Sequence, residues 1–342
     1  MVRSDSASTM NIVHRSPMRE KMTLLGHAGL VTSHSTVVMR GHLRGSSVEV
    51  TDGVGPTVNG MKILLTGATG NIGSAVLDTL LDAGHDVVAA VRSDQAAATV
   101  AAKGATPVIG DLYDAGWLAG LLEGTDAAIH TAASDDAERL NLAVVEAAER
   151  AYGGTDRRFV LTSGIWEYGA GDGIHSSDTP APTDLVAWRV PLEDRLLAAD
   201  VSAAVLVPAV VYGHGKGLLS VIVDAPRTAD GALTLVGDGS QRWTWVHVDD
   251  LARLYLLAVT HPDAVGRLIA SDGAPVSVRE VAEATGSDAS PESVEATRAR
   301  LGTAFADALL LDQAAFGAEA RELGWTPEHH GVLHELAGVP AR

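Results

Sequence analysis

Short apolar runs alternate with longer amphipathic segments from Met61 onward. Apolar runs of four to seven residues are typical of strands covered on both faces of a parallel sheet, and apolar residues recurring every three to four positions are typical of helices. The predicted strands are 62–66, 86–91, 106–109, 126–130, 157–163 and 202–207, and the predicted helices are 71–83, 95–103, 117–122, 135–152 and 184–199. This alternation predicts an α/β fold built on a doubly wound parallel sheet.

The alternation is absent from both ends of the chain. After residue 207, glycine and proline become frequent and the predicted elements become short and mixed, so we expect a small C-terminal lobe over 208–342. Residues 1–60 show no persistent period and lack the central apolar run of a signal peptide. We interpret 1–60 as a disordered or non-native N-terminal extension upstream of a natural start at Met61, and 61–207 as the main domain.

Composition excludes several classes of function. The 342 residues include 25 basic and 43 acidic side chains, a formal net charge of −18, and no cysteine. Nucleic acid is not expected as a partner because phosphate binding needs clustered Lys and Arg. The lack of cysteine excludes disulfides, thiolate metal sites and thiol catalysis. A membrane partner is not expected either, because no apolar run reaches the roughly 18 residues of a membrane span.

A glycine-rich turn joins the first predicted strand to its helix, in the sequence Thr66–Gly73. Gly67 permits a tight turn, Gly70 lets the backbone approach a pyrophosphate, and Gly73 allows close packing of helix and sheet. The helix N-terminus adds free N–H groups and a partial positive charge for the anion. The turn therefore predicts a Rossmann site for NAD or NADP. The residues expected to bind the cofactor here are Gly67, Thr69, Gly70, Asn71, Ile72 and Gly73.

The end of the second predicted strand bears on the choice of cofactor. An acidic residue at this position binds the ribose hydroxyls of NAD, whereas an Arg accommodates the 2′-phosphate of NADP. Here the strand is followed by Arg92, Ser93 and Asp94. We favour NADP, with Arg92 paired to the phosphate. The alternative is that Arg92 is a solvated loop residue and Asp94 binds the ribose of NAD.

Six segments together resemble the extended and atypical short-chain dehydrogenase/reductases, the NAD-dependent epimerase/dehydratase group. The resemblance covers about Met61 to the C-terminus and rests on Thr66–Gly73, Gly110–Leu112, His130–Ala133, Thr162–Gly169, Pro208–Gly213 and Val246–Ala252. It implies that the C-terminal lobe binds substrate. It also implies cofactor contacts from Asp111, Leu112, Thr131, Ala132 and Ala133.

The chain departs from the family at its usual catalytic groups. The family carries Tyr-x-x-x-Lys on the helix after the fifth strand, and a Glu four residues beyond the Lys matches Glu193. That register places Leu185 at the Tyr position and Arg189 at the Lys position. Gly164 stands where the family has its catalytic hydroxyl, and Ser163 lies one residue earlier. Because Leu185 cannot donate a proton, an acid must come from elsewhere.

Replacements for the missing acid follow the fifth strand, at the edge of the sheet where ligands bind. They are Tyr168, Ser163, Glu167 and His175. We predict Tyr168 as the proton donor, Ser163 as the group that orients the substrate oxygen, and Arg189 as a ligand of the nicotinamide ribose. The alternative for Tyr168 is an aromatic ring that packs against the lobe.

The leading hypothesis is an NADP-preferring oxidoreductase that acts on a carbonyl or alcohol of a small molecule. One alternative is a non-net-redox epimerase, dehydratase or isomerase, and another is an NADP-binding sensor without catalysis. His329, His330 and His334 lie close together in the sequence, and His330 and His334 are four apart, as on one helix face. A zinc site needs a third protein ligand and groups that orient the ligands, so we expect no metal. We expect a cytoplasmic protein. The sequence leaves the oligomeric state open, with a homodimer as the assembly to test.

Overall fold

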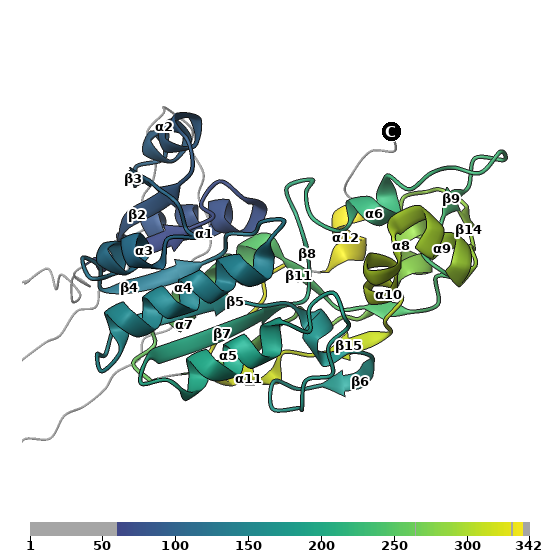
Figure 1. Cartoon of the computed structure of the whole chain (residues 1–342). Coiled ribbons are helices and arrows are strands. Elements are labelled where there is room, and N and C mark those ends of the chain that lie inside the picture. The colour runs from purple at the N-terminus through teal and green to yellow at the C-terminus, as the bar shows by residue number, and fades with distance from the viewer. Residues whose placement is uncertain (1–59, 264, 330, 338–342) are drawn as a thin grey trace, which may run out of the picture. The chain divides into compact units, whose positions relative to one another are not determined.

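A seven-stranded parallel sheet is the centre of the computed structural model, which describes residues 60–263, 265–329 and 331–337 (Figure 1). The strand order is β12-β7-β5-β4-β1-β2-β3, and all six pairings are parallel. From β1, the strands β2 and β3 extend the sheet toward one edge, and β4, β5, β7 and β12 extend it toward the other. Ligands bind in sheets of this kind at the point between β1 and β4 where this direction reverses. The strands are β1 (Lys62–Thr66), β2 (Asp86–Val91), β3 (Thr106–Ile109), β4 (Ala127–His130), β5 (Arg158–Thr162), β7 (Ser202–Pro208) and β12 (Gly266–Ala270).

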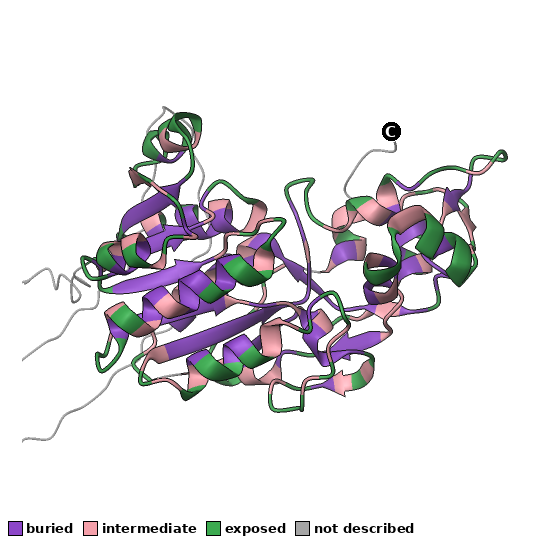
Figure 2. Ribbon diagram, in the orientation of Figure 1, coloured by how far each residue is buried: buried purple, intermediate pink, exposed green. Residues whose placement is uncertain are grey.

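Helices cover both faces of this sheet and bury its apolar side chains (Figure 2). One face packs against α1 (Asn71–Asp82), α2 (Asp94–Ala102), α7 (Val248–Thr260) and α11 (Ala318–Glu322). The other packs against α3 (Ala115–Leu122), α4 (Ala137–Tyr152) and α5 (Arg189–Ala198). Burial on both faces explains why the strands read as continuous apolar runs.

A separate apolar cluster forms the C-terminal lobe, around Trp243, Trp245 and Tyr212. Its strands pair only two by two, which accounts for the short, irregular pattern in the sequence. The remaining elements are η1 (Ile165–Tyr168), β6 (Gly171–Ile174), β8 (Val210–Tyr212), α6 (Ser220–Val223), β9 (Leu233–Thr234), β10 (Arg242–Trp243), β11 (Trp245–His247), β13 (Val276–Ser277), α8 (Val278–Ala284), β14 (Ala289–Ser290), α9 (Val294–Leu301), α10 (Thr303–Leu309), β15 (Gln313–Ala315) and α12 (Val332–Ala337).

The doubly wound parallel sheet is confirmed, and two details of the prediction were wrong. A seventh strand, β12, comes from beyond residue 207 and pairs with β7, so the sheet has one strand more than the six predicted. The helix predicted over 184–199 begins only at Arg189. Pro191 explains the difference, since its ring and missing N–H are tolerated in the first turn of a helix but not in its interior.

Two further expectations concern the N-terminal extension and membrane-spanning helices. Residues 1–59 lie outside the described residues, so the interpretation of the N-terminal extension stays a prediction. Among the described residues, no helix is long and apolar enough to cross a membrane.

Candidate active site at the carboxyl edge of the sheet

The glycine turn between β1 and α1 is held tightly against the segment that follows β4. Gly67 has φ +74°, and a Cβ atom there would lie 2.6 Å from the Ala132 nitrogen. A Cβ atom on Gly73 would lie 2.1 Å from the Gly67 oxygen and 2.6 Å from Thr131 Oγ1. Thr131 in turn donates a hydrogen bond to the Thr66 carbonyl at 2.8 Å. Only glycine at positions 67 and 73 allows this approach of α1 to the sheet.

The start of α1 is open where an anion would bind. Gly70 is the N-cap residue and makes no side-chain capping bond, and the first N–H groups of a helix have no partner within it. A Cβ atom on Gly70 would meet only the Gly67 oxygen, at 3.2 Å. Thr69 is exposed, and Asn71 and Ile72 line the adjoining cavity. This cradle fits a dinucleotide pyrophosphate.

Residues expected at the adenosine end follow β2 and β3. Arg92 is exposed directly after β2, and within the described residues it makes no hydrogen bond or ion pair. The Ser93 hydroxyl accepts a hydrogen bond from the Ala96 N–H and caps α2. Asp111 is exposed and accepts the Tyr113 N–H at 3.0 Å, whereas Leu112 is buried in the core. Ala133 is exposed after β4. Their contacts with a cofactor stay predictions.

A cavity of about 710 Å³ extends from the start of α1 to the loop after β8. It brings together Ser163, Arg189 and Leu185 from the predicted catalytic region. The other lining residues are Asn71, Ile72, Ser134, Asp135, Asp136, Ala137, Glu138, Gly164, Ile165, Trp166, Val186, Trp188, Pro208, Ala209, Val210, Val211, Gly217 and Leu218. The walls are mostly apolar, and Arg189 is the one basic side chain among the described lining residues.

Arg189 is placed at the base of this cavity by the first turn of α5. Its Nη1 donates a hydrogen bond to the Thr162 carbonyl at 3.4 Å, and its guanidinium lies 5.0 Å from the Trp188 ring centre. Its Nε is buried without a hydrogen-bond partner among the described residues. Arg189 therefore keeps unused donors that can bind a hydroxyl-rich ligand such as a ribose.

His130, at the end of β4, is only 1 % exposed, and its Nδ1 lies 2.7 Å from Thr66 Oγ1. Burial, assisted by the positive charge of Arg189, lowers the pKa of His130 to about 3. The imidazole is therefore neutral near pH 7 and does not supply a proton there.

Ser163 is connected to a buried carboxyl group. Its hydroxyl hydrogen-bonds to Glu167 Oε2 at 2.6 Å, and the Glu167 side chain is completely buried. Burial and the nearby charge of Glu193 raise the pKa of Glu167 to about 8, although the bond from Ser163 and the charge of Arg267 oppose the shift. Glu167 is therefore mostly protonated at pH 7, behind a serine that faces the cavity.

The other two acid candidates lie away from the cavity. Tyr168 is 5 % exposed, its hydroxyl donates to the Ser176 carbonyl at 2.9 Å, and it is not among the described lining residues. Burial also raises its pKa. His175 is exposed, with its Nδ1 3.4 Å from Glu319 Oε1. The predicted role of Tyr168 as proton donor therefore lacks a contact with the cavity, while Ser163 and Arg189 have one.

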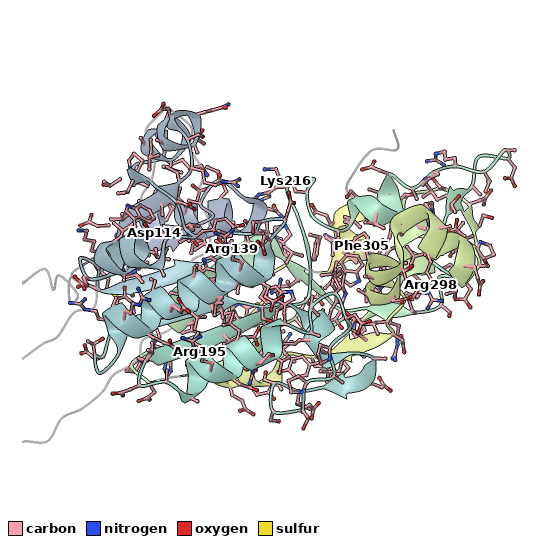
Figure 3. All side chains as sticks on the ribbon, in the orientation of Figure 1. Asp114, Arg139, Arg195, Lys216, Arg298 and Phe305 are labelled. Carbon is pink, nitrogen blue, oxygen red and sulfur yellow. The ribbon has the colours of Figure 1, made fainter. Side chains whose placement is uncertain are left out.

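The Tyr-x-x-x-Lys spacing does occur once in the chain, at Tyr212 and Lys216. Tyr212 is fully buried in β8, where its ring packs edge-on against Trp245. Lys216 is exposed at the tip of the following loop (Figure 3). Neither side chain lines the described cavity, so this pair does not restore the family's usual catalytic groups.

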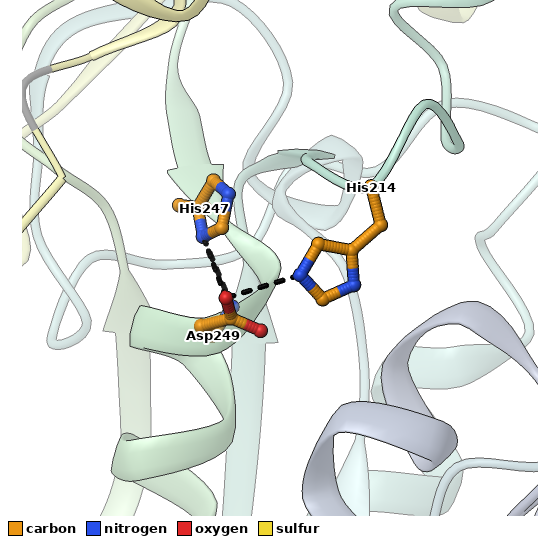
Figure 4. Close-up of side chains that lie close together, drawn as sticks. All are labelled: His214, His247 and Asp249. Carbon is orange, nitrogen blue, oxygen red and sulfur yellow. Dashed lines mark hydrogen bonds and ion pairs between the residues drawn. The ribbon is translucent and has the colours of Figure 1, made fainter. Parts of the chain in front are cut away.

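Two histidines and a carboxylate meet beside the start of α7 (Figure 4). Asp249 Oδ2 lies 3.1 Å from His214 Nε2 and 3.7 Å from His247 Nδ1. However, His247 Nδ1 accepts the Asp249 N–H and caps α7, and the His247 ring stacks on His329 at 3.5 Å. Both roles are structural, and the described contacts do not call for a metal.

Sequence reasoning did not foresee the pairing of Glu167 with Glu193. Glu193 served only to set the register of the family motif, and Glu167 was one of four candidate acids. One signal in the sequence could have indicated that Glu167 is buried, because this charged residue stands between two aromatic residues, Trp166 and Tyr168.

Comparisons with known proteins agree with this geometry. The model of the NAD dependent epimerase/dehydratase family matches residues 63–269. An uncharacterized protein of Schizosaccharomyces pombe is 30 % identical over 293 residues, which cover 81 % of this chain and 98 % of that protein. The 2-alkyl-3-oxoalkanoate reductase of Stenotrophomonas maltophilia is 30 % identical over 249 residues, covering 65 % and 73 %.

Solved structures share the fold of this chain. MoeE5, solved with UDP-glucose and NAD, is 27 % identical with a TM-score of 0.64 and coverage of 81 % of this chain and 96 % of that one. A human epimerase family protein solved with NADPH has a TM-score of 0.65 at 19 % identity, covering 81 % and 99 %, and shares the fold. Both of these neighbours were solved with a nicotinamide cofactor. The chain belongs to the NAD-dependent epimerase/dehydratase family of short-chain dehydrogenase/reductases.

Proposed function

We propose that this protein is an NADP-preferring oxidoreductase that interconverts a carbonyl and an alcohol on a small, largely apolar molecule. The observation that carries the proposal is the single cavity that joins the open start of α1 to Ser163 and Arg189 under apolar walls. The reductase from Stenotrophomonas, whose name specifies reduction of an oxo group, supports this class of reaction.

Different residues of the chain would bind the cofactor and donate the proton in such a reaction. The glycine turn and the first N–H groups of α1 hold the pyrophosphate, and Arg189 holds the nicotinamide ribose. A bound reduced nicotinamide supplies a hydride. Ser163 reaches the cavity and donates a hydrogen bond, and then a proton, to the substrate oxygen as negative charge develops on it.

The charges around the cavity favour a neutral substrate. Asp135, Asp136 and Glu138 line one side, and Arg189 is the one cation among the described lining residues. A nucleotide sugar would bring a second diphosphate, besides that of the cofactor, into a cavity whose described lining has three carboxylates and one cation, which is unfavourable. An uncharged ketone or aldehyde instead buries its apolar part against Val186, the residues after β7 and Leu218.

A panel experiment tests the proposal. Purified protein is incubated with NADPH and a series of neutral ketones and aldehydes, with dihydroxyacetone phosphate, a ketone that carries a phosphate, as the charged control, and consumption of NADPH is followed. Consumption with an apolar carbonyl compound and little or none with the phosphorylated ketone is the expected result. Tight NADPH binding without turnover of any compound would favour the alternative of an NADP-binding sensor without catalysis. Leu185 at the position of the family's catalytic Tyr supports that alternative.

Arg92 should set the preference for NADP. Its exposed guanidinium has no partner among the described residues, so it is free to pair with a 2′-phosphate. Arg92→Ala should weaken NADP binding by about 1–3 kcal/mol, the value of a charge-assisted hydrogen bond, and leave NAD binding nearly unchanged. Calorimetric titration with both cofactors measures this. Arg150→Ala, an exposed Arg on α4, is the control. Equal losses for both cofactors would show that Arg92 does not read the phosphate.

A further inference from the structure

Two carboxyl groups lie inside the protein directly behind the cavity. Glu167 on η1 is 0 % exposed and Glu193 on α5 is 2 % exposed. Glu167 Oε1 accepts no hydrogen bond from a donor group of the described residues. In addition to burial, a hydrogen bond between the Glu167 and Glu193 carboxyls raises the pKa of Glu167 because it requires a proton on one of them. Ionising both carboxyls at such depth is costly unless each is paired and hydrogen-bonded.

The nearby cations do not balance both carboxylates. Arg267 on β12 lies 3.4 Å from Glu193 Oε2 through its Nε, but its Nη2 pairs with the exposed Asp194 at 2.8 Å. Arg189, the other cation near the pair, interacts with both carboxyls through its charge, but it lines the cavity and makes no ion pair with either among the described contacts. Tyr168 on η1 adds no charge near pH 7, because burial raises its pKa. One carboxyl is therefore best kept protonated, and Glu167 is the one raised by burial and by Glu193.

Ser163 is the only side chain that the described contacts place between Glu167 and the cavity. Its Oγ lies 2.6 Å from Glu167 Oε2, and the serine itself lines the cavity. A hydroxyl can accept one proton while it donates another, so this serine can pass a proton between a buried acid and a ligand.

We propose that Glu167 is a buried proton reservoir that acts through Ser163 and replaces the acid missing at Leu185. This inference rests on the proposed carbonyl chemistry. In the reducing direction, the carbonyl carbon accepts hydride from reduced nicotinamide, and the substrate oxygen takes the hydroxyl proton of Ser163. Ser163 takes the proton of Glu167, which becomes a carboxylate beside Arg267. After product leaves, water in the cavity returns a proton along the same path. Glu167 thus acts through Ser163 and does not touch the substrate, whereas Ser163 contacts the substrate oxygen directly.

Infrared spectroscopy tests the reservoir without any turnover. A protonated carboxyl has a carbonyl stretching band distinct from that of a carboxylate. Wild-type protein at pH 7 should show this band, and it should disappear as the pH rises through about 8. Glu167→Gln should remove the band, Ser163→Ala should keep it, and the exposed control Glu123→Gln should leave it unchanged. A wild-type spectrum without the band, or a band that persists in Glu167→Gln, would overturn the proposal.

The pH profile of reduction tests the relay. Wild-type kcat should be level below pH 8 and fall about tenfold per unit above it, because only protonated Glu167 supplies the proton. Glu167→Gln should lower kcat at least tenfold at pH 7 and lose this fall, with cofactor affinity retained. An unchanged pH profile in Glu167→Gln would refute the relay. A wild-type protein without turnover would instead overturn the proposed function, and the infrared band would still decide whether Glu167 stores the proton.

Discussion

Replacing Ser163 by alanine should reduce kcat about 100- to 10,000-fold, which is the usual contribution of a positioned general acid. The Ser163 hydroxyl is the group that joins Glu167 to the cavity, so its removal leaves the substrate oxygen without a proton donor. NADP affinity should stay within about twofold, because the pyrophosphate cradle is formed by other residues. Steady-state kinetics and calorimetric titration on the same preparation measure both quantities.

Tyr168→Phe is the matched control for this experiment. It also removes one hydroxyl near the end of β5, but that hydroxyl donates to the Ser176 carbonyl. We expect nearly full activity, with a loss of stability of about 1 kcal/mol for the broken hydrogen bond. If Tyr168→Phe abolishes turnover and Ser163→Ala does not, the donor predicted from the sequence replaces the one proposed from the structure.

Gly70→Val should abolish useful cofactor binding while the protein remains folded. Gly70 has φ −76°, which other residues adopt, and a Cβ atom there would meet only the Gly67 oxygen at 3.2 Å. The added side chain occupies the space that a pyrophosphate needs at the start of α1. The dissociation constant should rise at least tenfold, about 1.4 kcal/mol.

Two further glycines separate binding from folding in this test. Gly120→Ala on α3 adds a Cβ atom with nothing within 4 Å, so both stability and affinity should be retained. Gly73→Ala places a Cβ atom 2.1 Å from the Gly67 oxygen and should lower the melting temperature. Unchanged NADP affinity in a folded Gly70→Val protein would mean that the cofactor lies elsewhere.

The sheet could be predicted from the sequence because each strand of its first half is a short apolar run followed by a helix. Residue 62 begins β1, and 86–91 and 106–109 reproduce β2 and β3. The prediction failed for β12, which forms a strand only by pairing with a strand that is far away in the sequence. The five residues of β12 contain Arg267 and become a strand by pairing with β7, about 60 positions earlier in the chain.

The candidate site was predictable only where one residue type is required locally. Gly67 and Gly73 could be identified because their positions in the turn tolerate no side chain. Ser163 and Glu167 could only be placed among several acid candidates, since their hydrogen bond and the approach of Glu193 depend on how η1, α5 and β12 pack. The burial of Tyr168 depends on the same packing.

Transfer of deuterium from NADPH that carries two deuterium atoms at nicotinamide C4 tests hydride transfer to the substrate, whichever of the two positions the protein uses. Wild-type protein is incubated with the labelled cofactor and an apolar ketone, and the product is examined by mass spectrometry. We expect an alcohol that carries one deuterium on its carbinol carbon, formed about 100-fold or more slowly by Ser163→Ala. Saturable NADPH binding with no deuterium in any product would instead show that the protein binds the dinucleotide without reductase chemistry.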